Sequence, residues 1–350
     1  MNENRIPKPI ILDDEKPSPE QLREAFEIAL QIWKLQPWDQ PMGENQLLAV
    51  EHADGRRYVL SVLGEYGEHR ALTIYRDVAS YARIAAIPPG DQIRVQDAFF
   101  SIPQRQFAFL RANELLKGER AALKTSGVKF PRGVNPSIES YVPGYAPEVM
   151  GAGELAEAIN AAKVFLDFMS RHSAEDVNIY RGRGDLVSTW RESPDGKWVL
   201  GEDEFSPLFP VAVNLSQPLL DKVAALPVKE NFNLEIGAIP VPTGKSKSGR
   251  GLMGRFMVAV EGETQFTMGV DLLDPPEGRE FDWTSAVEFA LKVMVEFGYK
   301  PGHLGVLGES LKGVLSGLCS TVLKGTTFLP HCECDAVREV YEFTAQRMGY

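Results

Sequence analysis

The alternation of apolar and polar residues across positions 231–350 is the feature that most limits how this chain folds. Apolar residues at every second position favour strands, whereas spacings of three and four favour amphipathic helices. Both spacings occur here in turn, separated by glycine-containing breaks. The expected strands are 232–239, 255–261, 265–272, 303–307 and a stretch within 320–329, and the expected helices are 283–297, 309–318 and 335–348. This part of the chain is therefore predicted to run β-β-β-α-β-α-β-α.

Residues 1–230 predict a second mixed region, in which helices alternate with short strands. Ser18-Pro19-Glu20-Gln21 carries a capping-box pattern and is expected to open a helix. Gly127 is placed like the left-handed glycine that ends a helix. The expected strands are 46–52, 57–63, 70–75, 98–102, 107–111, 177–181, 186–191, 197–200 and 209–214, and the further helices are 77–86, 118–126, 154–172 and 217–225.

The segment 131–153 is rich in glycine and proline, which predicts a connector with turns and no strand or helix. We place a domain boundary there. The chain is then expected to be an α+β protein of two or three mixed α/β domains. The expected parts are a flexible tail (1–18), an N-terminal α+β domain (19–150), a middle segment of one helix and antiparallel strands (151–230) and a C-terminal α/β domain (231–350).

The composition indicates a globular protein with a core of its own. Hydrophobic residues make up 44% and the formal net charge is −11, so nucleic acid is not supported as a partner and a protein partner is the open alternative. Three cysteines fit a reducing compartment better than a disulfide framework. The first residues lack the apolar core of a signal peptide, and no stretch reaches the roughly 20 apolar residues that cross a bilayer. We therefore expect a cytoplasmic protein that does not enter the membrane.

Several motifs resemble a family of bacterial proteins that is known only as paired domains of unknown function. The resemblance covers nearly the whole chain after residue 20 and implies no activity. The motifs that carry it are Trp33-Lys34-Leu35-Gln36-Pro37-Trp38, Gly64-Glu65-Tyr66-Gly67-Glu68-His69, Gly127-Val128-Lys129-Phe130-Pro131, Tyr141-Val142-Pro143-Gly144-Tyr145 and Asn231-Phe232-Asn233-Leu234-Glu235-Ile236.

The order expected for residues 231–350 also resembles the ribonuclease H-like fold of nucleases, integrases and transposases. That resemblance implies acidic residues on the first strand, after the fourth strand and on the last helix, which together hold two Mg²⁺ or Mn²⁺ ions. The matching positions are Glu235, Glu309 and either Asp335 or Glu339. The first position is Glu where that fold usually has Asp. As ordinary residues, Glu235 would be the exposed position of a strand and Glu309 would stabilise the first turn of a helix.

Other side chains offer weaker candidate sites. Thiolate and imidazole groups bind zinc, but His331, Cys332 and Cys334 provide a single Cys-x-Cys where structural zinc sites use paired Cys-x-x-Cys spacings; a loop entering a helix is the alternative. Glu65, Glu68 and His69 gather near Tyr75, where a histidine beside carboxylates suits acid–base chemistry, although a polar turn is favoured.

Two basic clusters are candidates for binding anions. One is the hairpin loop with Lys245, Lys247 and Arg250, which does not meet the spacing of a phosphate-binding loop. The other is Arg181 with Arg183, near Trp190, where an arginine-protected strand edge is the alternative.

No complete catalytic set emerges from these candidates. The sequence therefore favours a non-catalytic binding or regulatory protein without a cofactor. The alternative is a divergent metal-dependent nuclease or phosphotransfer enzyme built on residues 231–350.

Overall fold

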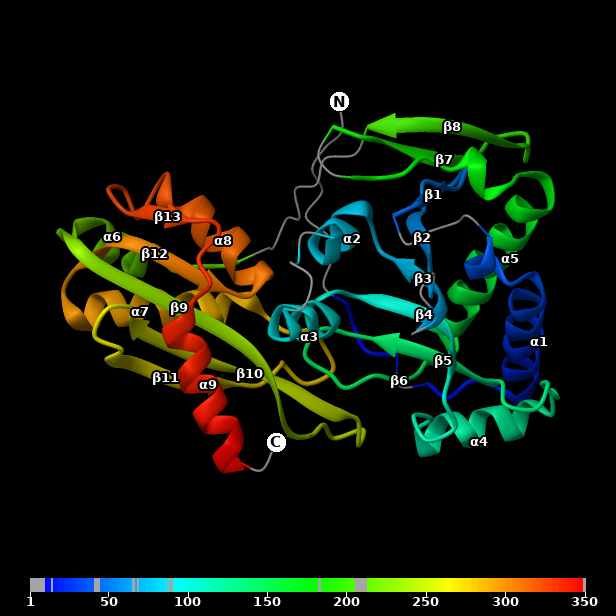
Figure 1. Ribbon diagram of the computed structural model, residues 1–350, viewed down its shortest axis with the longest axis horizontal. Coiled ribbons are helices and arrows are strands. Elements are labelled where there is room, and N and C mark those ends of the chain that lie inside the picture. Colours follow the sequence, from blue (N-terminus) through cyan, green and yellow to red (C-terminus); the bar gives the residue numbers. More distant parts are fainter. Residues whose placement is uncertain are drawn as a thin grey trace.

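The computed structural model describes residues 10–13, 15–40, 45–64, 67, 69–85, 87, 91–181, 184–204 and 213–348. The chain forms two mixed sheets, each covered by helices, that lie side by side (Figure 1). Their strand orders are β6-β5-β4-β3-β2-β1-β7-β8 and β11-β10-β9-β12-β13. The predicted α+β class is thus confirmed.

The first sheet is antiparallel except where β1 runs parallel to β7. Its strands are β1 (Leu48–Glu51), β2 (Arg57–Leu63), β3 (Arg70–Tyr75), β4 (Gln104–Leu110), β5 (Asn135–Tyr141), β6 (Glu148–Val149), β7 (Leu186–Glu192) and β8 (Trp198–Glu204). One face packs its main apolar core against α1 (Pro19–Leu35), α4 (Lys117–Ser126) and α5 (Ala152–Arg171). The other face carries a smaller apolar cluster together with α2 (Val78–Ala85) and α3 (Gln92–Ser101).

The ends of two helices on the main core are fixed by polar side chains. The predicted capping box is present at α1, because Gln21 N donates to Ser18 Oγ at 3.2 Å and Ser18 N donates to Gln21 Oε1 at 2.9 Å. The first turn of α5 begins at glycine residues and is capped from a distance: Asp13 Oδ2 accepts from Gly153 N at 2.6 Å and from Glu154 N at 3.0 Å. The segment around Asp13 therefore anchors the start of α5.

Three local predictions for the first region are wrong. Residues 98–101 belong to α3 and not to a strand, since Asp91 accepts from Arg94 N and caps a helix that buries Ala98 and ends at the buried C-cap Ile102. The expected connector 131–153 contains β5 and β6, which complete the sheet. Residues 177–181 form only an isolated bridge to Gln46 and no regular strand. The strand expected at 209–214 lies mostly outside the described residues.

Residues 151–204 contribute α5, β7 and β8 to the first sheet region, since β7 pairs with β1. The change from the first sheet to the second therefore falls after residue 204.

The second sheet is formed by residues 228–329. Its strands are β9 (Val228–Lys245), β10 (Gly251–Glu261), β11 (Thr267–Leu273), β12 (Lys300–Leu307) and β13 (Thr327–Leu329), and β9, β12 and β13 run parallel. The helices α6 (Gln217–Ala225), α7 (Trp283–Phe297) and α8 (Glu309–Cys319) pack on one face. The other face is crossed by α9 (Asp335–Met348).

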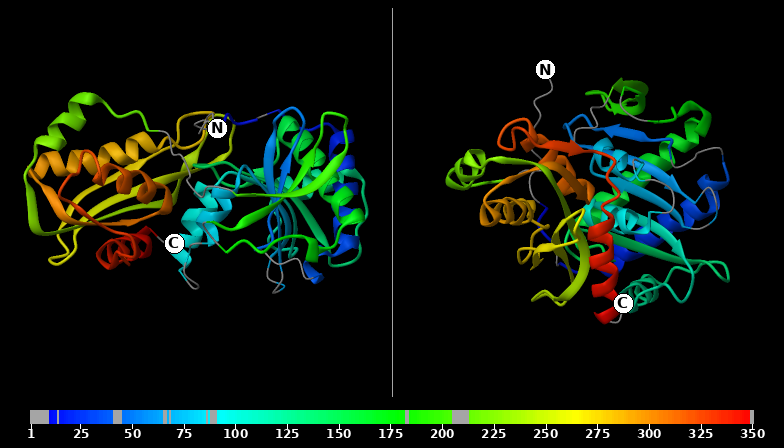
Figure 2. Two further views of the ribbon diagram at one scale, coloured as in Figure 1. Left: turned by 90° about the horizontal axis from the view of Figure 1, so that it is seen from above. Right: turned by 60° about the vertical axis from the view of Figure 1, so that its left-hand side comes forward.

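Helix α3 joins the two sheet regions (Figure 2). The fully buried Arg255 of β10 donates to Phe100 O and Ser101 Oγ at 2.8 Å, and its guanidinium lies 3.9 Å from Asp97. At the other end of α3, the Asp91 carboxylate receives two hydrogen bonds from Arg338 of α9, at 2.6 and 3.2 Å. Buried and paired charges hold this junction, so breaking one partner is costly.

Candidate functional site

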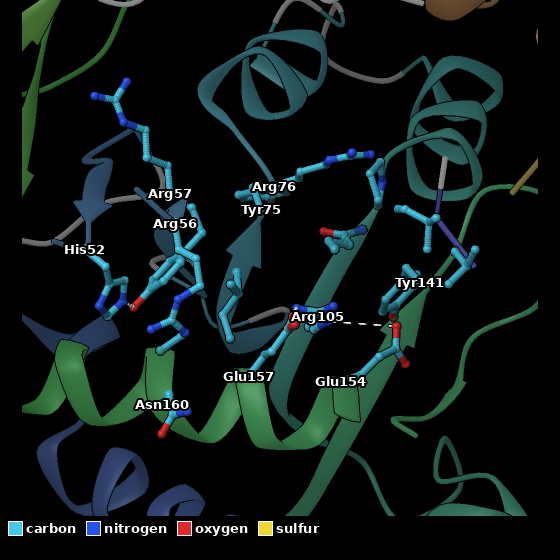
Figure 3. A pocket seen from close by; sticks show the side chains of 17 residues that line it. His52, Arg56, Arg57, Tyr75, Arg76, Arg105, Tyr141, Glu154, Glu157 and Asn160 are labelled. Carbon is cyan, nitrogen blue, oxygen red and sulfur yellow. Dashed lines mark hydrogen bonds and ion pairs between the residues drawn. The ribbon is translucent and has the colours of Figure 1, made fainter. Parts of the chain in front are cut away.

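A cleft of about 450 Å³ opens where β2, β3, β4 and β5 end beside the first turns of α5 (Figure 3). Its lining includes four arginines and two glutamates, and carboxylates outside the lining, Asp54 and Glu51, pair with two of these arginines. The arginines are Arg56, Arg57, Arg76 and Arg105. Aromatic side chains, namely His52, Tyr58, Tyr75 and Tyr141, form much of the remaining wall.

Arg105 lies at the centre of the cleft and is held by α5 (Figure 3). Its Nη1 is 2.8 Å from Glu157 Oε2, and its Nε is 3.8 Å from Glu154 Oε1. Ser140 Oγ donates to that same Glu154 oxygen at 3.0 Å. The Arg105 side chain is 29% exposed, so solvent and ligands reach it while two carboxylates fix its position. An oriented guanidinium of this kind suits the planar recognition of carboxylates or phosphates.

On the left side of the cleft in Figure 3, the His52 ring contacts a phenol hydroxyl and a carboxylate. His52 lies 3.2 Å from Tyr58 Oη through Nε2 and 3.2 Å from Glu192 Oε2 through Nδ1. Burial raises the pKa of Tyr58 above its usual range, so this hydroxyl stays protonated at neutral pH. Arg57 pairs with Glu51 at 2.5 Å, which orients it along the rim.

A row of polar side chains crosses the sheet face next to the cleft. Ser61, Thr73, Gln106 and Glu139 are direct cross-strand neighbours on β2, β3, β4 and β5, and each is 4% exposed or less. Gln104, which lines the cleft, is 3% exposed and lies on the same face. Sheet interiors are normally apolar, so a continuous buried polar row is a costly feature unless its groups find partners.

Two atoms on this face have no partner among the residues that the structure describes. They are Thr73 Oγ1 and Gln104 Nε2. Gln104 Oε1 accepts from Gln106 Nε2 at 3.3 Å, and Gln106 Oε1 lies 2.9 Å from His69 Nε2. Leaving a buried donor unpaired costs about 1–3 kcal/mol. The amide of Gln104 is therefore available to a group that enters the cleft.

The row ends at a pair of buried carboxyl groups. Tyr141 Oη donates to Glu139 Oε2 at 2.5 Å, and Glu119 of α4 accepts from Ser137 Oγ at 2.7 Å. Burial and the neighbouring Glu119 raise the pKa of Glu139 to about 7, against the hydrogen bond from Tyr141. Burial and the Glu139 charge also raise the pKa of Tyr141. Glu139 thus changes its charge near neutral pH beside the cleft.

Two of the acidic residues matched to the ribonuclease H-like fold, Glu235 and Glu309, have structural partners. Glu235 Oε2 accepts from Ala336 N at 3.0 Å and Val337 N at 3.3 Å, so it caps α9. Burial raises the pKa of Glu235, although these backbone bonds oppose the rise. Glu309 begins α8 and pairs with Lys312 at 3.3 Å. Asp335 and Glu339 are exposed on α9.

His331 is exposed, Cys332 is half-buried and Cys334 is buried. Within the part of the chain that the structure describes, no three His, Cys, Asp or Glu side chains form a group that could hold a metal ion. That finding covers the carboxylates Glu235, Glu309, Asp335 and Glu339 as well as His331, Cys332 and Cys334. The structure does not assemble either set around a common point.

The basic residues are not brought together either. Lys245 and Lys247 are exposed in the hairpin between β9 and β10. Arg250 is buried and donates to Ala146 O at 3.0 Å and Ser140 O at 2.8 Å, so it ties the hairpin to β5. Arg181 is exposed, and Arg183 lies outside the described residues.

Sequence reasoning missed the cleft, because its arginines come from separate strands and turns. One signal was available: polar residues occupy alternate positions of adjacent strands, at Ser61, Thr73 and Gln106. The expected cluster near Tyr75 was partly informative, since His69 contacts Gln106 on this face. Glu65 and Glu68 of that cluster lie outside the described residues.

Comparison with known proteins adds a family model for part of the chain. Residues 23–184 match a model described as "Domain of unknown function (DUF7309)". Neither a curated protein nor a solved structure matches the chain. No helix among the described residues is long and apolar enough to span a bilayer. The matched segment contains the Glu119–Glu139 pair and every residue that lines the cleft except Ile10.

Proposed function

We propose that this chain is a non-catalytic binding protein whose cleft at the end of the first sheet takes a small organic anion. The cleft itself carries the proposal, because it concentrates four arginines against two glutamates in an acidic chain. A volume of about 450 Å³ lies within the range of small-molecule sites. We expect the protein to work in the cytoplasm.

The walls indicate the chemistry of the ligand. Arg105 faces the cleft in a fixed orientation and suits a carboxylate or phosphate group. Tyr58, Tyr75 and His52 offer ring surfaces, so a ligand that carries a planar ring gains contact area as well as charge pairing. The unpaired Gln104 Nε2 adds one hydrogen-bond donor. A nucleoside monophosphate combines these features and is the first probe.

Isothermal titration of adenosine monophosphate, with pyrophosphate and benzoate as partial probes, tests this proposal. We expect measurable binding that weakens with added salt, because exposed charges are screened. Arg105→Gln is expected to weaken binding at least tenfold. Arg111→Gln is the matched control, since the Arg111 side chain is 79% exposed and lies outside the cleft. Absence of heat with all three probes, or equal binding by the Arg105 variant, would remove the proposal.

The strand order of the second sheet is the one observation that favours the alternative enzyme. In the order β11-β10-β9-β12-β13, the central β9 is flanked by an antiparallel hairpin and by parallel strands, which supports a ribonuclease H-like topology. A nuclease also needs acidic residues that converge on Mg²⁺ or Mn²⁺. Calorimetric titration with Mn²⁺ tests this. Binding heat that is present in the unmodified chain and absent in Glu235→Gln would favour the enzyme. No binding heat in the unmodified chain would favour the binding protein.

A further inference from the structure

Two cysteines meet at the loop that leads into α9. Cys332 and Cys334 are separated by one residue, and the Cys334 thiol donates to Cys332 O at 3.8 Å. Both sulfur atoms face Gly305 of β12: a Cβ atom at that glycine would lie 2.6 Å from Cys332 Sγ and 3.4 Å from Cys334 Sγ. A side chain at residue 305 would displace the sulfurs, so the glycine leaves room for the pair.

The two thiols differ in access. Cys332 is half-buried at the surface of the loop, whereas Cys334 is only 1% exposed. The neighbouring Cys334 thiol lowers the pKa of Cys332 to about 7 despite partial burial. The neighbouring Cys332 thiol and burial raise the pKa of Cys334. Cys332 is thus the nucleophile of the pair, and Cys334 is the thiol behind it.

The backbone of the loop is held in an uncommon conformation. Cys334 has a φ of 56°, in the left-handed region that residues other than glycine seldom adopt. Such conformations cost about 1–3 kcal/mol and persist where the surroundings enforce them. Here Arg94 Nη2 donates to Cys332 O at 2.8 Å and Arg338 Nε donates to Glu333 O at 2.7 Å. Arginines from α3 and α9 therefore fix the loop that presents the two sulfurs.

We propose that Cys332 and Cys334 are a redox-active dithiol, which exchange with a small-molecule disulfide converts reversibly into an intramolecular disulfide. The Cys332 thiolate attacks one sulfur of the small disulfide, whose S–S bond breaks and releases one thiolate. Cys334 then loses its proton to that thiolate and attacks Cys332 Sγ, which releases the second thiolate; this thiolate takes up from solvent the proton that Cys332 had given up. Two cysteine thiols are oxidised, and one small disulfide is reduced to two thiols.

Cys319 provides the internal control. It lies at the end of α8, and burial raises the pKa of its thiol, so it is the less reactive type of cysteine. The chain has three cysteines in all. Oxidation of the proposed pair therefore leaves one free thiol.

The test equilibrates the full chain with glutathione buffers of increasing oxidised fraction, followed by acid quench, maleimide labelling and intact mass measurement. We expect the labelled thiols to fall from three to one in a single step. Peptide mapping should place the bond between Cys332 and Cys334. Cys319→Ser should still form it, and Cys334→Ser should instead trap glutathione on Cys332. Three labelled thiols in every buffer, or a disulfide that includes Cys319, would overturn the proposal.

Discussion

Replacing Glu139 by glutamine tests whether ionisation of its buried carboxyl group lowers the free energy of unfolding as pH rises. The pKa of Glu139 is raised by burial to about 7 in the folded chain, above the 4.5 of an unburied glutamate. A carboxyl whose folded pKa is raised stabilises the fold only while it stays protonated. This stabilisation is therefore lost as pH rises from about 4.5 through 7, because in that range Glu139 ionises in the unfolded chain but stays protonated in the folded one.

The size of this effect follows from the two pKa values. At about 1.36 kcal/mol per pKa unit, ionisation of Glu139 costs the fold about 1 kcal/mol at pH 5 and about 3 kcal/mol at pH 8. Glutamine keeps an acceptor for Tyr141 Oη and carries no charge. Glu139→Gln removes this cost at both pH values. The gain in the free energy of unfolding over the unmodified chain should therefore be about 2 kcal/mol larger at pH 8 than at pH 5.

Urea unfolding followed by tryptophan fluorescence measures this difference. Four of the five tryptophans, Trp33, Trp38, Trp190 and Trp198, lie in the first sheet region, so the signal reports chiefly on it. Glu296→Gln, at an exposed position of α7, is the control, and its change in stability should not differ between the two pH values. If Glu139→Gln changed the free energy of unfolding equally at pH 5 and pH 8, Glu139 would not ionise between these pH values and the reasoning would be refuted.

Two further substitutions test the packing. Ser18→Ala removes the capping box of α1 and should lower stability by about 1 kcal/mol in the same urea assay, and an unchanged midpoint would contradict the role of this cap. Arg255→Met leaves the buried Asp97 without its nearby cation and should cost about 3–5 kcal/mol, measured as faster hydrogen exchange in α3; native-like protection of α3 would show that the ion pair does not hold the junction.

The sequence predicted the elements whose signals are local. The bounds of β2, β3, α6, α7 and α9 agree with the expected ranges, since glycine, proline or capping residues mark their ends. The capping box at Ser18 and the left-handed Gly127, with a φ of 69°, are confirmed for the same reason. Such signals depend on a few neighbouring residues, so a single chain displays them.

The missed elements depend on partners far along the chain. β5 contains Pro136, and a proline argues against a strand. Pro136 nevertheless lies opposite Phe109 of β4, and on its other edge β5 pairs with the short β6 only at Glu139 and Ser140. Proline is tolerated at such an edge position. Residues 98–102 are a short, mostly apolar run, but the helix capped by Asp91 continues through them to Ser101. Pairing and packing decided both cases.

The candidate site was the least predictable part. Arg56, Arg57, Arg76 and Arg105 lie on different strands or turns, and only the antiparallel register brings them to one cleft. The residues that the sequence did single out are explained by local structure, as for Glu235, which caps α9. A charged residue read from sequence alone does not reveal which partner it will meet.

A crystal structure of the chain soaked with adenosine monophosphate tests the central claim, that the arginine-lined cleft receives a small organic anion. We expect phosphate oxygens within about 3 Å of the Arg105 guanidinium, with the base against the tyrosine wall. A ligand bound elsewhere, or an empty cleft at saturating concentration, would contradict the account.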